Sequence, residues 1–149
     1  MLDNLTVKRL DKFDVNDAIG IGKLMPFLSQ RLSDKPMSTE ILKAIIDSPN
    51  QVQIVARLDN EIVGTATLSL ILGPAVMKSA YLSDFVTNPN IRGKGVGSKI
   101  WDEMIAWCKE QDANLTFTSK TKREDAHRFY INHGAEVHDT TVFKVTLRK

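Results

Sequence analysis

Hydrophobic and polar residues alternate along this chain with two different periods, and each period predicts a kind of element. A period of two residues, or a short apolar run bounded by turn residues, predicts strands over residues 5–10, 52–58, 62–72, 80–87, 115–118 and 141–147. Apolar residues that recur every three or four positions predict helices that begin near Asp14, near Ser38 or Thr39, at Val96 and near Thr121. The elements therefore follow the order β-α-α-β-β-β-α-β-α-β.

Turn and cap residues mark the ends of these helices. Asp14 and Ser38 are residue types whose side chains cap helix N-termini, and Pro26 is expected to limit the first helix. Residues 121–124, Thr-Lys-Arg-Glu, form a capping box for the last helix, which Gly134 is expected to end.

The order of elements predicts the fold class, α+β (mixed α/β), in a single domain over residues 1–149. We expect a central mixed β-sheet of about six strands flanked by helices. The strand over residues 80–87 is almost entirely apolar, which is typical of a central strand. The helix over residues 96–111 is expected to bury an apolar stripe, made up of Val96, Ile100, Met104, Ile105 and Cys108.

The composition excludes several classes of protein. The 20 Lys and Arg residues and 18 Asp and Glu residues give a net charge of +2, too balanced for general electrostatic binding of nucleic acid. The single cysteine, Cys108, and three histidines without i, i+4 spacing predict neither a disulfide framework nor a metal site. No apolar run approaches the roughly 18–20 residues of a membrane span, and no secretory signal is recognisable. We therefore expect a cytoplasmic protein without a membrane partner.

A segment between the fourth predicted strand and the third predicted helix combines glycines with two cations: Arg92, Gly93, Lys94, Gly95 and Gly97. Glycines let the backbone approach an anion, and a helix N-terminus adds a partial positive charge, so we expect a phosphate-bearing ligand here. The alternative is a tight turn without a ligand. A dinucleotide-binding fingerprint is disfavoured, because the turn follows the fourth strand and no acidic residue ends the next one.

A second motif lies in the last predicted helix, over residues 126–135. Ala126, Phe129 and Tyr130 share one helix face, which core packing explains for Phe129. The Tyr130 hydroxyl needs a polar partner if it is buried, and a phenol with a pKa of about 10 can donate a proton to a leaving thiolate. Core packing and proton donation both remain open for Tyr130.

Together the two motifs resemble those of the GNAT N-acetyltransferases. Residues 92–97, Arg-x-x-Gly-x-Gly, are similar to the acetyl-CoA signature of that family, Q/R-x-x-G-x-G/A. Residues 126–134, Ala-x-x-Phe-Tyr-x-x-x-Gly, are similar to its second motif, although Ala135 stands where the family usually has Phe. The order of elements also matches, so the resemblance covers nearly the whole chain. Within the family, residues 118–130 are similar to bacterial acetyltransferases of small amines.

The resemblance implies acetyl transfer from the co-substrate acetyl-CoA to the primary amine of a small molecule, by direct attack in a ternary complex and without a metal. The strand over residues 115–118 would diverge from its neighbour to admit pantetheine, and Tyr130 would protonate the departing thiolate. The residues expected to bind acetyl-CoA are Phe85, Val86, Thr87, Arg92, Gly93, Lys94, Gly95, Val96, Gly97, Ser98, Arg123 and Phe129. Homodimers are common among the proteins that this chain resembles, so a homodimer is among the expected assemblies.

Two charged residues have more than one open role. Asp84 lies between Leu82 and Val86 on one face of the strand that we expect to be central, where a carboxylate is costly unless it is used or paired. One role is that of a catalytic base or of a group that binds the substrate ammonium. The alternative is a structural role, in which Asp84 accepts hydrogen bonds from backbone N–H groups at a bend and water is the base. Arg123 either reaches a ligand phosphate or an anionic substrate, or is a solvated residue at the start of a helix.

Two rival functions stay open at this point. A protein or peptide acetyltransferase would use the same fold, with the predicted loop over residues 29–38 as its specificity element. A non-catalytic acyl-CoA-binding sensor would bind acetyl-CoA without releasing CoA, and the presence of Tyr130 and Asp84 argues against it.

Overall fold

The computed structural model of this protein describes residues 3–148. Residues 1, 2 and 149, the ends of the single domain expected from the sequence, lie outside the described residues. The described chain forms two compact units, one that ends at Phe117 and one that begins at Thr118.

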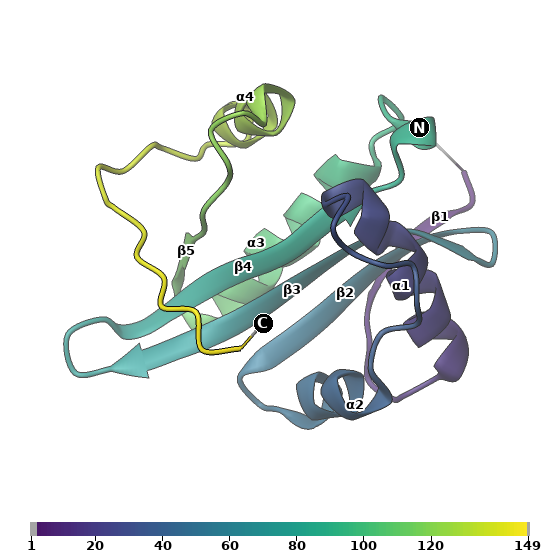
Figure 1. Ribbon diagram of the computed structural model, residues 1–149, viewed down its shortest axis with the longest axis horizontal. Coiled ribbons are helices and arrows are strands. Elements are labelled where there is room, and N and C mark those ends of the chain that lie inside the picture. The colour runs from purple at the N-terminus through teal and green to yellow at the C-terminus, as the bar shows by residue number, and fades with distance from the viewer. Residues whose placement is uncertain (1–2, 149) are drawn as a thin grey trace. The chain divides into compact units, whose positions relative to one another are not determined.

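The first unit is built on one mixed β-sheet of five strands (Figure 1). The strands lie in the order β1-β2-β3-β4-β5, with β1 Leu5–Arg9, β2 Gln51–Leu58, β3 Glu61–Gly73, β4 Met77–Thr87 and β5 Asn114–Thr116. Neighbours from β1 to β4 pair antiparallel, whereas β4 and β5 pair in parallel. The mixed sheet and the interior place of β4 confirm the sequence prediction.

The helices of the first unit are α1 Val15–Leu28, α2 Thr39–Asp47 and α3 Val96–Gln111, together with a short 3₁₀ helix, η1 Pro89–Ile91. The side chain of Asp14 caps α1 by accepting a hydrogen bond from the N–H of Asn16 at 2.8 Å. Ser38 Oγ caps α2 by accepting from the N–H of Ile41 at 3.2 Å. The prediction that Pro26 limits α1 is wrong, because the helix continues to Leu28. Pro26 removes one hydrogen bond, from its own position to the carbonyl of residue 22, but it does not prevent the next two residues from continuing the helix.

The helices cover both faces of the sheet, with α1 and α2 on one face and α3 on the other (Figure 1). Val55 of β2 and Val86 of β4 mark the first face, because they share a hydrophobic cluster with residues of α1 and α2. The buried members of this cluster are Leu10, Ala18, Ile21, Leu24, Leu42, Val55, Ile62 and Val86.

Gly64 of β3 allows α3 to lie very close to the other face. A Cβ atom placed on Gly64 would lie 2.6 Å from Cδ1 of Ile100 and 3.3 Å from Cγ2 of Thr87 and Cγ1 of Val96. Sequence analysis missed this contact, although a lone glycine within a strand often signals close approach of another element. The buried residues of α3 are the expected Val96, Ile100, Met104 and Cys108, joined by Trp101 and Trp107, whereas Ile105, also expected in the stripe, is half-buried.

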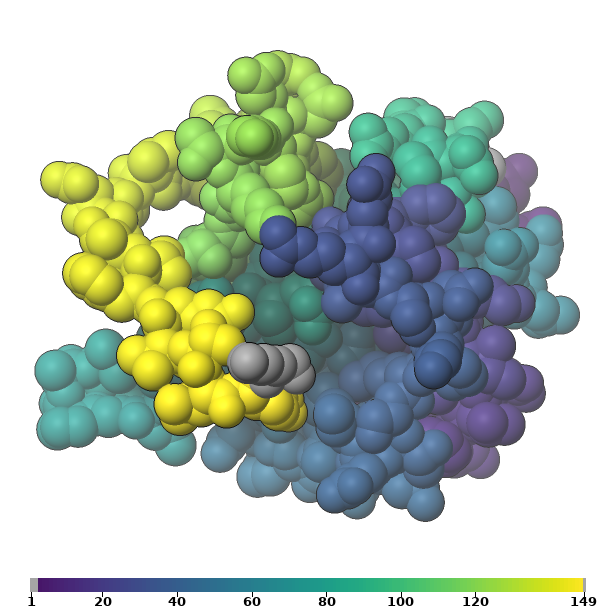
Figure 2. All heavy atoms as spheres, viewed as in Figure 1, coloured from purple at the N-terminus to yellow at the C-terminus, as the bar shows by residue number. Residues whose placement is uncertain are grey.

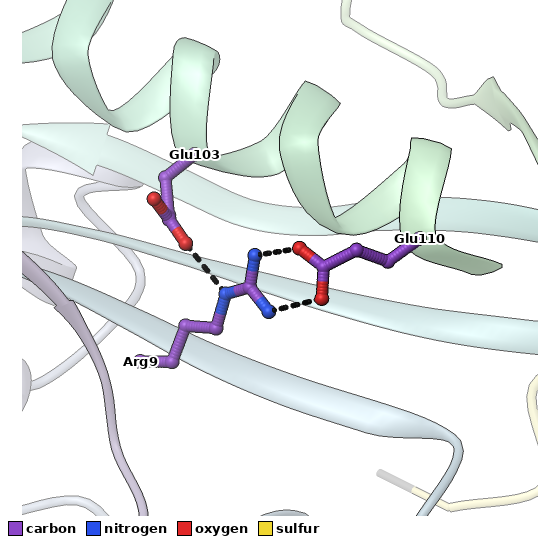
Figure 3. A network of polar contacts seen from close by, with 3 residues as sticks. All are labelled: Arg9, Glu103 and Glu110. Atoms are coloured by element: carbon purple, nitrogen blue, oxygen red, sulfur yellow. Dashed lines mark hydrogen bonds and ion pairs between the residues drawn. The ribbon is translucent and has the colours of Figure 1, made fainter.

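An ion-pair network connects the edge strand β1 to α3 (Figure 3). Arg9 Nε donates to Glu103 at 2.5 Å, and the two terminal nitrogens of Arg9 donate to the two oxygens of Glu110 at 2.8 and 2.5 Å. The two carboxylates raise the pKa of Arg9, and Arg9 in turn lowers the pKa of Glu110. The network therefore fixes the position of α3 across the sheet through three charge-assisted hydrogen bonds.

The β3–β4 hairpin extends past the part of the sheet that β2 pairs. The last pair between β2 and β3 is Gln51 with Ser69, whereas β3 and β4 continue to pair as far as Gly73 and Met77. Figure 2 views the molecule from the side of α1 and α2, and the teal tip of the hairpin stands clear of these helices. The hairpin tip carries exposed apolar side chains, at Ile71, Leu72, Val76 and Met77.

The second unit contains one helix, α4 Glu124–Asn132. Its N-cap is Arg123, which makes no side-chain cap, so the predicted capping box over residues 121–124 is wrong. The predicted end at Gly134 is confirmed, because Gly134 has a left-handed φ of 97°. The N–H of Gly134 donates to the carbonyl of Ile131 and the N–H of Ala135 to that of Tyr130, the pattern of a Schellman motif.

The sixth strand expected over residues 141–147 is absent from the described residues, so the sheet has five strands. Phe143, Val145 and Leu147 are 87%, 80% and 92% exposed. The alternation of these apolar residues with other residues is a local property of the sequence. A strand, however, forms only where its backbone N–H and C=O groups can pair with those of a neighbouring strand.

Candidate functional site

The glycine turn between β4 and α3 keeps the N-terminus of α3 open. Gly93 and Gly95 have φ values of 78° and 86°, which glycine adopts without steric cost. Gly95 is the N-cap of α3, and it has no side chain that could accept hydrogen bonds from the first N–H groups of the helix. The turn therefore leaves these N–H groups without a side-chain cap, and backbone groups of this kind can bind an anion.

The cations of this turn remain available to a ligand. Arg92 and Lys94 are exposed, and Gly97 and Ser98 are half-buried. Val96 is buried and packs toward Gly64, so only its backbone could serve a ligand. The structure thus brings all the predicted residues from 92 to 98 into one turn and the first turn of α3.

A β-bulge interrupts β4 shortly before the glycine turn. Two residues of β4, Asp84 and Phe85, lie opposite the single residue Ala66 of β3. The backbone of Asp84 is left-handed, with a φ of 55°. Among residues with a side chain, Asp and Asn adopt this conformation most readily, so the bulge itself favours the residue type found here.

The bulge overturns the placement predicted for Asp84. Leu82 pairs with Leu68 on the face that α3 covers, whereas Val86 belongs to the cluster under α1 and α2. Leu82 and Val86 therefore lie on opposite faces, because a bulge adds one residue and reverses the alternation beyond it. Asp84 is exposed, so the burial on which its expected role depended is absent.

The strands β4 and β5 separate before the bulge. Their first pair is Ser79 with Asn114, and their last pair is Tyr81 with Thr116. Beyond Tyr81, β4 continues to Thr87 without pairing to β5. The strand expected over residues 115–118 thus ends at Thr116, and its divergence to admit pantetheine stays a prediction. The end of β4, with the predicted residues 85–87, lies beyond the last pair with β5 and leads directly into η1 and the glycine turn.

In the second unit, the predicted Tyr130 and Phe129 lie on α4, and the predicted Arg123 is its N-cap. Tyr130 is 8% exposed and lies edge-on to Phe129, with ring centres 5.9 Å apart. Burial raises the pKa of Tyr130 above its usual value, while the charge of Arg123 acts in the opposite direction. The phenol is therefore protonated at neutral pH, which is the form that can donate a proton. Phe129 also stacks on His133, with ring centres 4.0 Å apart.

Two buried polar atoms of the second unit have no hydrogen-bond partner among the described residues, Ser119 Oγ and His127 Nε2. Buried polar atoms in native proteins are usually satisfied, by water or a ligand where the protein offers nothing. No sequence pattern points to Ser119, because one hydroxyl in a polar segment is not distinctive.

A nucleophilic cysteine, a metal site and a membrane-spanning helix each have structural requirements that can be compared with the described residues. Cys108 is 4% exposed, and burial raises the pKa of its thiol, which disfavours the nucleophilic thiolate. From residue 3 to residue 148, no three His, Cys, Asp or Glu side chains are grouped so that they could hold a metal ion. Within the same range, no helix has both the length and the apolar character that a membrane crossing requires.

Solved structures share this fold over nearly the whole chain. An aminoglycoside acetyltransferase from an uncultured soil metagenomic sample, in complex with trehalose, matches with a TM-score of 0.85 and 21% identity over 98% of each chain. Its complex with sisomicin matches with a TM-score of 0.84, again at 21% identity over 98% of each chain. A protein from Bacillus halodurans C-125, described as a transcriptional regulator, matches with a TM-score of 0.79 and 23% identity, over 96% of this chain and 99% of the other. At such identities the likeness shows the fold alone.

The sequence also matches a family model. No curated protein sequence matches this chain. The model of the acetyltransferase (GNAT) family, however, matches residues 23–135, which is more than half of the chain. The matched range includes the glycine turn, the β4 bulge and all of α4. The chain therefore belongs to the acetyltransferase (GNAT) family.

Proposed function

We propose that this acetyltransferase transfers an acetyl group from acetyl-CoA to the primary amine of a small molecule, by direct attack in a ternary complex. Acetyl-CoA is the general co-substrate of the family. The observation that carries the proposal is the open N-terminus of α3, with Gly95 as its cap and two exposed cations beside it. A pyrophosphate matches this combination of backbone donors and positive charge.

Two segments of the first unit are assigned to acetyl-CoA, one to its pyrophosphate and one to its pantetheine and thioester. The N–H groups of residues 93–98 would hold the pyrophosphate, with Arg92 and Lys94 adding charge. A Cβ placed on Gly93 would meet no atom within 4 Å, so the backbone there is open to a ligand. The segment Phe85–Thr87 lies beyond the last β5 pair and would accept pantetheine as an added strand. One of its N–H groups would polarise the thioester carbonyl.

The chemistry replaces one bond to the acetyl carbon by another. The neutral amine attacks the thioester carbonyl carbon, a C–N bond forms, and the C–S bond to CoA breaks. A substrate that arrives as an ammonium loses one proton before the attack and a second on forming the amide, while the CoA thiolate gains one. We assign Tyr130 as the donor to the thiolate, because burial keeps its hydroxyl protonated. Arg123 and Phe129, on the same segment, are assigned to acetyl-CoA.

Asp84 is proposed as the group that attracts the ammonium and accepts its first proton, directly or through water. Its exposure permits contact with a substrate, but its left-handed backbone also gives it a structural role. The variant Asp84→Asn separates the two roles, because Asn tolerates the same backbone conformation and lacks the charge. We expect kcat/KM for the amine to fall roughly 10²-fold, with unchanged melting temperature and acetyl-CoA affinity. Unchanged amine kinetics would assign Asp84 to the bulge and the proton to water.

The test of the whole proposal is CoA thiol release with a panel of acceptors, comprising aminoalkylphosphonates, polyamines, amino sugars and peptide N-termini. The aminoglycoside acetyltransferases that share the fold support a small-molecule acceptor. Turnover of peptides alone would instead indicate a protein or peptide acetyltransferase. Binding of acetyl-CoA without thiol release from any acceptor would indicate a sensor.

A further inference from the structure

The two faces of the sheet differ in chemistry across β2, β3 and β4. Residues directly opposite one another in neighbouring strands have side chains on the same face. The face that α3 covers is apolar, with the paired residues Val52, Ile54, Ala66, Leu68, Ala80 and Leu82. On the opposite face, two cross-strand rows are polar and uncharged, Gln53–Thr67–Ser83 and Gln51–Ser69–Tyr81. We call these two rows the polar face.

Hydrogen bonds hold the buried part of the polar face in place. Gln53 Nε2 donates to Thr65 Oγ1 at 2.7 Å, and Thr67 Oγ1 donates to Gln53 Oε1 at 2.7 Å. Thr65 Oγ1 in turn donates to the carbonyl of Ile54 at 2.8 Å. Gln53 is 1% exposed and Thr65 is 0% exposed, so this network is part of the interior and cannot rearrange for solvent. It provides a rigid support for the groups beside it.

The outer part of the polar face is within reach of a ligand. Gln51, Ser69, Tyr81 and Ser83 are all half-buried, and Gln51 Nε2 donates to Ser69 Oγ at 3.0 Å. Ser83 immediately precedes the bulge at Asp84 and Phe85, so the polar face ends where β4 turns toward the proposed thioester position. Amide and hydroxyl groups both donate and accept hydrogen bonds, as the hydroxyls of a substrate do.

Because the side chains of the polar face carry no charge, they can recognise only some chemical classes of acceptor amine. A polyamine would be matched by several carboxylates, and a simple alkylamine by apolar side chains, and the two rows contain neither. We propose that the polar face forms one wall of the acceptor site and selects a hydroxyl-rich amine, of the amino sugar class, over an alkylamine. This inference rests on the proposed amine acetylation and names the acceptor class for it.

The test compares D-glucosamine with cyclohexylamine, which has a ring of similar size and no hydroxyls, by CoA thiol release at saturating acetyl-CoA. We expect the wild type to favour glucosamine in kcat/KM by roughly 10²-fold. The double variant Ser69→Ala/Ser83→Ala should reduce that preference about tenfold or more, while kcat/KM for cyclohexylamine stays within about twofold. Thr6→Ala, which removes an exposed hydroxyl from β1, is the matched control and should leave both values unchanged.

The outcomes separate this inference from the proposed function. Equal use of both amines, or an unchanged preference in the double variant, overturns the inference and leaves amine acetylation standing. A lower melting temperature with equal losses for both amines also overturns it, because the rows would then only support the fold. If no amine releases CoA, calorimetry of glucosamine binding in the presence of CoA decides. If the wild type binds glucosamine and the double variant does not, the polar face is a sugar site on a non-catalytic protein. If the wild type does not bind glucosamine either, both proposals are overturned.

Discussion

The contact between Gly64 and α3 gives a quantitative prediction for one methyl group. Gly64→Ala would place a Cβ atom 2.6 Å from Cδ1 of Ile100, about 1 Å closer than carbon atoms normally approach. Ile100 is 0% exposed, so its side chain has no solvent into which it could rotate. The backbone of Gly64 is not among those with positive φ in the described chain, so the effect of the substitution is steric.

The expected loss of stability follows from two opposing effects. Overpacking a well-packed core costs about 1–3 kcal/mol, while replacing glycine by alanine restricts the unfolded chain and stabilises by about 0.4–1 kcal/mol. We therefore expect Gly64→Ala to lower the free energy of unfolding by about 1–2 kcal/mol. It should also weaken acetyl-CoA binding, because Val96 in the first turn of α3 lies 3.3 Å from the new atom.

A double-mutant cycle with Ile100→Val isolates the steric contact, since this change removes the Cδ1 atom alone. Ile100→Val by itself should cost about 0.5–1.5 kcal/mol. The double variant should be more stable than the sum of the single changes predicts, by about 1 kcal/mol or more, and should recover acetyl-CoA affinity. Chemical denaturation and calorimetry measure both quantities. Additive single effects, or a fully stable Gly64→Ala protein, would refute the close approach of α3 to β3.

Three further predictions address the site and the network that positions it. Gly95→Glu should weaken acetyl-CoA binding more than tenfold, which is over about 1.4 kcal/mol, because it puts a negative charge at the open helix terminus; calorimetry on the folded variant measures this. Tyr130→Phe should lower kcat roughly 10²-fold by a constant factor from pH 6 to 9, because the raised pKa of Tyr130 keeps the phenol protonated over that range; a factor that varies with pH, or no loss, contradicts the proton-donor role. Arg9→Gln should lower the melting temperature by a few degrees at pH 7. That difference should vanish on acidification, because Arg9 lowers the pKa of Glu110 and the stabilisation it gives is lost as the pH falls through that value; an equal difference at pH 3 and pH 7 would exclude the ion pairs as its cause.

The sequence predicts best where the signals are local. The bounds of α3 and the glycine turn that precedes it agree with prediction, because an apolar stripe and a glycine turn depend on neighbouring residues only. The bulge at Asp84 could not be predicted, since Leu82 and Val86 have the spacing of a regular strand and only the register with β3 shows the extra residue. The strand expected over residues 141–147 failed for the same reason, because no local pattern supplies a pairing partner.

The two polar rows on one face of the sheet have a consequence for how such a chain can evolve. Substitutions at Gln51, Ser69 or Ser83 alter half-buried polar groups, and they touch neither the packing of α3 nor the glycine turn. Their cost in stability is therefore small compared with changes on the face that α3 covers. If these rows form the wall of the acceptor site proposed above, a few point mutations there would exchange one acceptor for another and leave the glycine turn unchanged.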